Sequence, residues 1–502
     1  MKRETQMSGA IFIRSMQRAF SGQRGTGSRR RWTFSLALIA LSGCASVPEV
    51  GNRPNIAKVE KLATARTLAG PQADWPSDRW WQDFGDPQLD QLMDEALAAS
   101  PTIAQAAARI RLAASQADFA RAALLPKAGL MATARYSRIS QNIGLPADGD
   151  WRLIGAGLLS ASYDIDLWGR NRSALRAAVS EQDAVAADAA EARLALTTSL
   201  ASVYADLAQQ FLRRSVAADA LDVRRATLDL VTRRFHAGLD PQAALEQAQA
   251  GVDAAVGAVA AADEAIALNR NMLAALVGAG PDRGLDIRPP ELARRRAPRL
   301  PADAAIGLIG RKPEIVSARW QVEAEGQHIA VARAGFYPNI NLAGLIGFAS
   351  VGLSKLFNDA SLIGSAGPAV SLPIFDGGRL RANYRGARAR YDVAVTQYDA
   401  ALLRGLHDVA DVVASLHALA PRQVAADSAT AREEAAYHLS LLRYQGGLAD
   451  YQSVLIVENA LLDARDQAAA LRLRGFVLDI ALVNALGGGF RGELPSVQDH
   501  SS

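Results

Sequence analysis

A seven-residue spacing of apolar positions dominates the middle of this chain. Residues 171–236 contain neither proline nor glycine, and Leu200, Leu207, Leu221 and Leu228 fall in one heptad register. This spacing is typical of helices that pack against others along their whole length. At about 1.5 Å per residue the segment predicts a helix of roughly 100 Å, which is longer than a compact domain needs.

Four other segments carry few charges and partly alternate between apolar and small or polar residues. They cover residues 127–142, 151–165, 339–350 and 361–375, and a loop containing glycine and polar residues joins the members of each neighbouring pair. A period of two predicts strands. Outside the amino-terminal leader there is no apolar run of 18 residues, which excludes helical membrane spans.

These segments belong to two copies of one unit. Three short motifs recur 209 residues later: residues 169–172 at 378–381, 234–239 at 443–448, and 273–278 at 482–487. A constant offset indicates that the intervening segments have fixed lengths. Each copy is therefore predicted to contain two strands, a very long helix, a tight turn and a shorter returning helix.

Glycines mark the predicted turn at the end of each long helix. Gly238 follows the first long helix, and Gly446 and Gly447 follow the second. Asp240 before Pro241 predicts the N-cap and the first residue of the first returning helix. We therefore expect one helical tip near residue 238 and another near residue 447.

The first 43 residues have the organisation of a secretion signal. Three arginines at 29–31 precede a short apolar run that ends in Leu41-Ser42-Gly43-Cys44, a match to the bacterial lipobox. We expect Cys44, the only cysteine, to become the lipid-modified first residue of the mature chain. An ordinary signal peptide with an incidental cysteine is the alternative. Ala45, rather than aspartate, follows the cysteine and favours the outer membrane.

The basic character of the chain belongs to this leader. The net charge is +4, but residues 1–43 contain eight Lys and Arg and one acid, a net of +7, so the mature chain carries −3. Charge therefore gives no argument for nucleic acid as a partner.

Four strands are too few to close a membrane-spanning sheet. Hydrocarbon offers no partner for unpaired backbone groups, and the smallest outer-membrane barrels use about eight strands. If these strands lie in a membrane, the chain must oligomerise, and three copies of four strands supply twelve. The predicted fold class is thus an α+β membrane protein. It combines a long α-helical coiled-coil barrel with four transmembrane β-strands per chain, which close a 12-stranded barrel as a trimer.

Several motifs resemble those of the outer-membrane efflux protein family, the TolC-like ducts, in its NodT-type lipoprotein branch. They lie at residues 80–89, 163–170 and 372–379 and at both tips, and the similarity runs from about Trp75 to Gly489. The resemblance implies a homotrimer in the outer membrane with a helical tunnel through the periplasm. It also implies a periplasmic adaptor and an inner-membrane pump, of the RND class or similar, as partners in the export of small toxic compounds or drugs.

The resemblance assigns contact with the adaptor to the helical tips. The residues that carry over are Arg234, Gly238, Leu239, Arg443, Tyr444, Gly447 and Leu448. The alternative is that the glycines merely turn the chain.

Candidates for a periplasmic gate are Tyr444, Asp450, Ser453 and Glu458. Here the chain departs from the family pattern. Ser453 and Ile456 stand where many members have aspartate, and Ala244 and Ala449 occupy the places of the usual partners of Tyr444. The gate chemistry of the family therefore does not carry over directly, and exposed helical acids are more often simply solvated.

The predicted organisation is a signal peptide (1–43), a lipid-anchored linker (44–74), a first repeat (75–278), an equatorial linker (279–310), a second repeat (311–487) and a tail (488–502). The chain contains no Gly-Lys dipeptide and no Gly-x-Ser-x-Gly motif, and its six histidines have no metal-ligand spacing. We therefore expect no enzyme, cofactor or metal site. Alternatives to an efflux duct are the duct of a type I protein-secretion system and a lipid-anchored coiled-coil scaffold without a pore.

Overall fold

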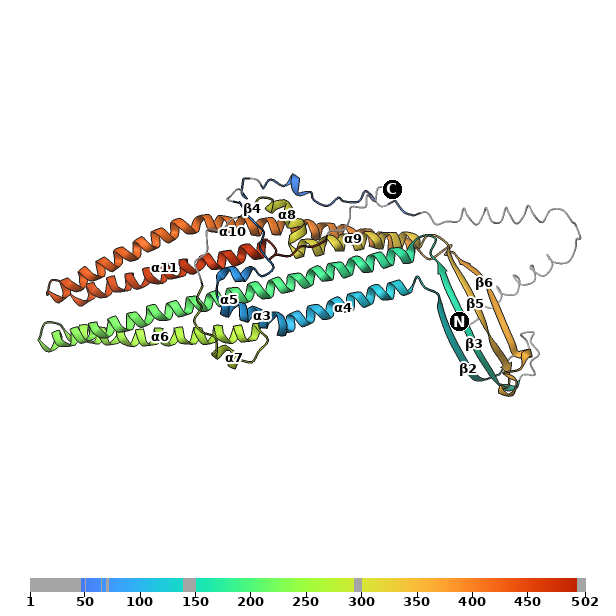
Figure 1. The fold of residues 1–502 in the computed structure, drawn as a ribbon, viewed down its shortest axis with the longest axis horizontal. Coiled ribbons are helices and arrows are strands. Elements are labelled where there is room, and N and C mark those ends of the chain that lie inside the picture. The colour runs from blue at the N-terminus through green and yellow to red at the C-terminus, as the bar shows by residue number, and fades with distance from the viewer. Residues whose placement is uncertain are drawn as a thin grey trace, which may run out of the picture.

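The computed structural model describes residues 47–49, 51–64, 66–68, 72–138, 150–292 and 300–493. The molecule is elongated, with long helices running side by side and a sheet that continues from one end of them (Figure 1). Cys44 and residues 139–142, the end of the first predicted strand, lie outside the described residues.

The helices of the two copies match in length. The pairs are α4 (Pro101–Ala122) and α9 (Pro313–Ala334) with 22 residues each, α5 (Arg170–His236) and α10 (Arg379–Gln445) with 67, and α6 (Gln242–Leu276) and α11 (Tyr451–Ala485) with 35. At about 1.5 Å per residue, α5 and α10 are each roughly 100 Å long. The predicted duplication is therefore confirmed, and α10 continues through Pro421 without ending.

Four antiparallel strands form the main sheet in the order β2 (Lys127–Arg138), β3 (Trp151–Ile165), β5 (Asn339–Val351) and β6 (Leu362–Ser371). The central pairing joins the two copies, with Leu159 of β3 opposite Ile346 of β5. Strand β6 ends earlier than the predicted boundary at 375, just ahead of Leu372 and Pro373, and proline has no backbone N–H to continue a ladder. Within the described chain, β2 and β6 are edge strands.

Aromatic pairs lie at both ends of the sheet. Tyr136 and Trp151 stack with ring centroids 5.9 Å apart where β2 and β3 approach their connecting loop. At the helical end, Trp168 and Tyr337 stack at 4.6 Å, and Trp168 Nε1 donates a hydrogen bond of 2.8 Å to the Pro338 carbonyl oxygen. Amphipathic aromatic rings at two levels are typical of strands that cross an outer membrane.

The main hydrophobic core lies near mid-length of the helical part. The 3-10 helix Trp80–Phe84 places both tryptophans and Phe84 against α5, α6 and α3 (Pro87–Ala99). Asp86 caps α3, accepting from Gln88 N at 2.9 Å. The same carboxylate accepts from the Tyr204 hydroxyl at 2.6 Å, which ties α3 to α5.

Short elements surround this level of both copies. They are the 3-10 helix Val59–Lys61, β1 (Gln72–Ala73), α7 (Asp282–Leu285), β4 (Leu300–Pro301) and α8 (Ala304–Arg311), with β1 and β4 paired in parallel. Two further 3-10 helices, Leu353–Lys355 and Asp359–Ser361, lie between β5 and β6.

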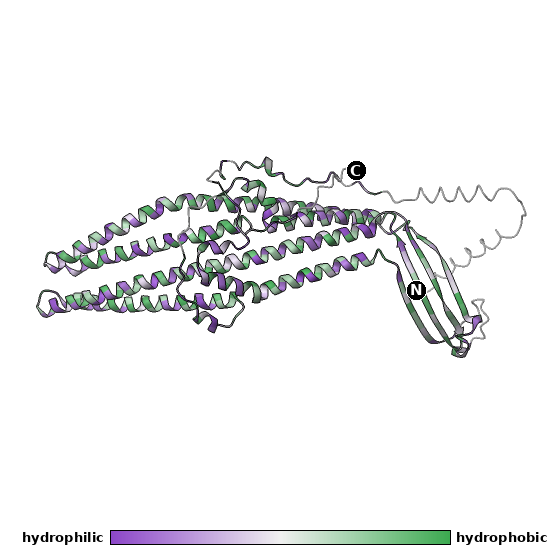
Figure 2. Cartoon of the chain, in the orientation of Figure 1, coloured by the Kyte–Doolittle hydropathy of each residue, from purple (hydrophilic) through white to green (hydrophobic). Residues whose placement is uncertain are grey.

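Hydrophobic and hydrophilic residues are interspersed along every long helix (Figure 2). In the described part of the chain, none of the helices combines the length and the apolar content needed to cross a membrane.

Candidate functional site

The two helical tips lie at the end of the molecule opposite to the sheet (Figure 1). Gly238 and Gly447 both have a φ of 72°, a left-handed conformation that glycine adopts without a steric cost. The N–H of Leu239 donates to the Arg234 carbonyl at 2.9 Å, and the N–H of Leu448 donates to the Arg443 carbonyl at 2.8 Å. These are the bonds of a Schellman motif, which ends a helix and satisfies its last carbonyls.

Both turns present a leucine to solvent. Leu239 is 64% exposed and Leu448 is 74% exposed, and Arg443 next to the second turn is exposed as well. Two other residues of the predicted tip set point inward instead, because Tyr444 is fully buried and Arg234 pairs with an acid. The predicted contact set therefore divides into an exposed group and an inward group.

Asp240 joins the inward residues of the two tips. Arg234 Nε and Nη2 donate to its two carboxylate oxygens at 3.0 and 3.3 Å. The Tyr444 hydroxyl at the end of α10 donates to the same carboxylate. The Arg234 guanidinium also lies 4.6 Å from the centroid of the Tyr444 ring, a cation–π distance. The first tip is thus linked through one mostly buried carboxylate to the second copy.

The expected N-cap role of Asp240 is wrong. Helix α6 begins at Gln242 with Pro241 in the N-cap position and no side-chain cap. The carboxylate is instead occupied by the guanidinium of Arg234, which donates two hydrogen bonds, and by the hydroxyl of Tyr444.

Protonation states at neutral pH favour this cluster. Burial raises the pKa of Asp240, but the hydrogen bonds from Arg234 and Tyr444, together with the Arg234 charge, outweigh it and bring the pKa below the ordinary value. Burial, and then the hydrogen bond to Asp240, raise the pKa of Tyr444. Asp240 is therefore an anion and Tyr444 a protonated donor.

The predicted gate residues also divide. Asp450 is the N-cap of α11 and accepts from Ser453 N at 2.9 Å and from Ser453 Oγ at 2.6 Å. This pair makes a local helix cap. Glu458, in contrast, is buried and accepts from Arg224 Nε at 2.9 Å across the two copies.

Arg224 joins three helices at this level. It lies on α5 and donates to the Gly251 carbonyl on α6 at 3.0 Å and to Asn459 Oδ1 on α11 at 3.0 Å, in addition to Glu458. Arg224 was not among the residues predicted from the sequence, and Asp240 was predicted to cap a helix. The sequence signal that could have identified the Asp240 cluster was a difference between the two copies. The offset of 209 aligns Asp240 with Ala449 and Tyr444 with Phe235.

The sequence model of one protein family, described as "Outer membrane efflux protein", matches residues 92–279 and 307–488 of this chain. Each matched range corresponds to one copy of the repeat. The chain belongs to the outer membrane efflux protein family. This is a family of outer-membrane transport ducts, not of enzymes.

Relatives and a solved structure cover most of this efflux protein. It is 36% identical over 374 residues to the fusaric acid resistance protein FusA of Burkholderia cepacia, which covers 71% of this chain and 69% of FusA. It is 30% identical over 474 residues to the multidrug resistance outer membrane protein MdtP of Shigella flexneri, covering 90% and 94%. The crystal structure of the outer membrane protein VceC from Vibrio cholerae superposes with a TM-score of 0.78 at 39% identity, covering 83% of this chain and all of VceC. The protein is an outer-membrane efflux channel.

Proposed function

We propose that three copies of this chain form the outer-membrane duct of a tripartite pump that exports small toxic compounds. The observation that carries the proposal is a four-stranded sheet with two open edges, continuous with helices roughly 100 Å long. Open edges are not tolerated in hydrocarbon, so β6 of one copy pairs with β2 of the next until the sheet closes. The helices then continue as a tube.

The export of small molecules is supported by the relatives. FusA is named for resistance to fusaric acid and MdtP for multidrug resistance. The chain lacks the phosphate-binding loop of an ATPase, so an inner-membrane partner supplies the energy. Lipid modification of Cys44 adds an anchor to the same membrane.

The exposed residues of the tips form the surface that meets a periplasmic adaptor. Leu239 and Leu448 are apolar, solvent-facing and placed at equivalent turns of the two copies. Arg443 adds a charge beside the second turn. The inward cluster around Asp240 holds the two tips in register. Its hydrogen bonds within the chain take the place of the contacts that Tyr444 would make with its usual family partners, whose positions are occupied here by Ala244 and Ala449.

Leu448→Glu tests the tip assignment. A charge on this exposed leucine should weaken adaptor docking without affecting folding, so trimer yield stays normal while drug resistance in a complemented deletion strain falls. Val424→Glu is the matched control, because Val424 is 71% exposed on α10 and lies far from the tip. Full resistance from a normally abundant, trimeric Leu448→Glu protein would return this turn to a purely structural role.

A further inference from the structure

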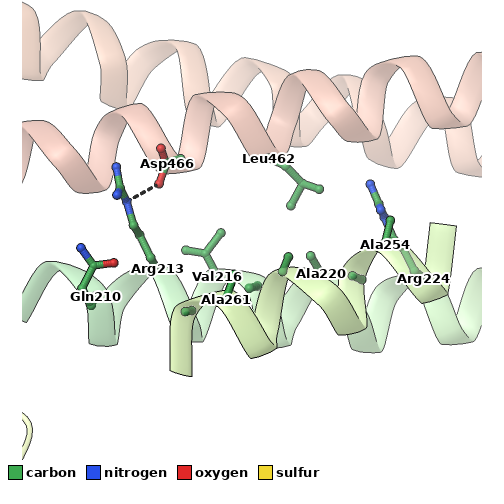
Figure 3. A pocket seen from close by; sticks show the side chains of 13 residues that line it. Gln210, Arg213, Val216, Ala220, Arg224, Ala254, Ala261, Leu462 and Asp466 are labelled. Atoms are coloured by element: carbon green, nitrogen blue, oxygen red, sulfur yellow. Dashed lines mark hydrogen bonds and ion pairs between the residues drawn. The ribbon is translucent and has the colours of Figure 1, made fainter. Parts of the chain in front are cut away.

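Two cavities flank the contact between α5 and α11, where the two copies meet. The first has a volume of about 410 Å³ and is lined mainly by alanines of α5 and α6 (Figure 3). Arg213 and Asp466 bridge it with an ion pair of 3.1 Å. Arg224 at its other end is engaged by Glu458. The charged groups of this cavity are therefore satisfied by one another.

The second cavity has an unsatisfied acid. Its volume is about 300 Å³, and its walls come from α5, α10 and α11. Glu458 lines it with a side chain only 3% exposed. The Glu458 Oε1 atom accepts from Arg224, whereas Oε2 is buried and has no hydrogen-bond partner among the described residues. A buried carboxylate oxygen without a donor is costly, so a donor is expected here.

The other charged groups at this cavity are already engaged. Arg465 directs its Nη2 donor to Glu434 at 2.6 Å, and Glu458 Oε2 receives no hydrogen bond from it. Burial, and then the charge of Glu458, raise the pKa of Tyr437, so Tyr437 remains a neutral phenol. Its ring, together with Leu461 and Val223, gives the cavity an apolar wall.

The size of the cavity favours a small molecule over one water molecule. A water occupies about 30 Å³ in the liquid and needs two to four polar partners, whereas ligand pockets begin near 300 Å³. A free anionic oxygen beside an aromatic ring and aliphatic side chains is the environment that recognises an ammonium group on an apolar body.

We propose that this cavity binds a small organic monocation, whose ammonium donates to Glu458 Oε2 while its apolar body lies against Tyr437, Leu461 and Val223. Because α5 belongs to the first copy and α10 and α11 to the second, the bound cation bridges the two helix pairs. It therefore stabilises the arrangement in which they are packed together. This site lies within the wall formed by the helices of the two copies.

Calorimetric titration of the purified full-length protein in detergent tests the proposal with phenethylamine, which is cationic at pH 7, and its neutral analogue 2-phenylethanol. We expect saturable binding of the amine with a Kd of about 1 mM or tighter. The alcohol should bind at least about tenfold more weakly, because it cannot form the charge-assisted bond.

Three variants locate the site. Glu458→Gln should weaken amine binding about tenfold or more and remove the preference over the alcohol. Glu434→Gln is the matched control: this acid borders the same cavity but is exposed, so the Kd should change less than about threefold. Val223→Phe fills the cavity and should abolish binding of both probes, which keeps the test valid if Glu458→Gln does not fold.

The outcomes separate clearly. No saturable amine binding, or equal affinity for amine and alcohol, overturns the proposal. Wild-type affinity in Glu458→Gln or in Val223→Phe places the amine elsewhere and also overturns it.

Discussion

Replacing Tyr444 with phenylalanine should loosen the helical tip without unfolding the protein. The change removes only the hydroxyl that donates to Asp240. The ring keeps its contacts with Tyr451, at 6.0 Å between centroids, and with the Arg234 guanidinium at 4.6 Å. Asp240 retains both hydrogen bonds from Arg234, so the carboxylate is not left without a partner.

The magnitude follows from the kind of bond that is lost. A hydrogen bond to a charged group contributes about 1.5–3 kcal/mol. The lower part of this range applies because Arg234 still neutralises the acid, so we expect a loss of about 1.5–2 kcal/mol in the free energy of local opening. At about 1.4 kcal/mol per factor of ten, this is roughly a 10- to 30-fold change.

Hydrogen–deuterium exchange of the purified protein measures local opening directly. Protection should fall by this factor in peptides covering residues 234–244 and 441–452, and it should not change in α3 near mid-length. Tyr451→Phe is the matched control, because the Tyr451 ring packs on Tyr444 but its hydroxyl takes no part in the Asp240 cluster. Unchanged tip protection in Tyr444→Phe, or an equal loss in Tyr451→Phe, would refute the reasoning.

Three further predictions concern other parts of the molecule. The hydrogen bond with Glu181 at 2.9 Å raises the pKa of His328. The protonated His328–Glu181 pair therefore stabilises the folded protein below about pH 6.5, and this contribution is lost as pH rises through the folded-state pKa of His328. Thermal unfolding should then show His328→Gln to be less stable than the parent at pH 5.5 but not at pH 8.5, and a constant difference would contradict this. Gly347→Ala should reduce the heat-modifiable form on gels, because the new Cβ would lie 2.1 Å from a carbonyl oxygen of β3, whereas Gly367→Ala meets no atom within 4 Å and should assemble normally. Cys44→Ala should abolish incorporation of labelled fatty acid and lower abundance more than activity per assembled channel; an unlabelled parent protein would disprove the lipobox assignment.

The repeated architecture follows from local signals in the sequence. Heptad spacing, prolines and glycines act within a few residues of chain, so the long helices and their turns follow from local physics. The turn at Gly238 and the turn at Gly447 have the same φ because only the backbone between adjacent helices decides them. The overall architecture, with two strands and a pair of antiparallel helices in each copy, was predictable for the same reason.

The contacts between the two copies depend on how the helices pack in the assembled fold. Asp240 reaches Tyr444 across 204 positions, and Arg224 reaches Glu458 across 234. These residues have no equivalents in the other copy, because the offset of 209 aligns Asp240 with Ala449 and Tyr444 with Phe235. Which faces meet depends on the packing of four helices at once, and no local pattern encodes it. For that reason Asp240 could be predicted as a helix cap from its neighbours, while its role as the link between the tips required the assembled fold.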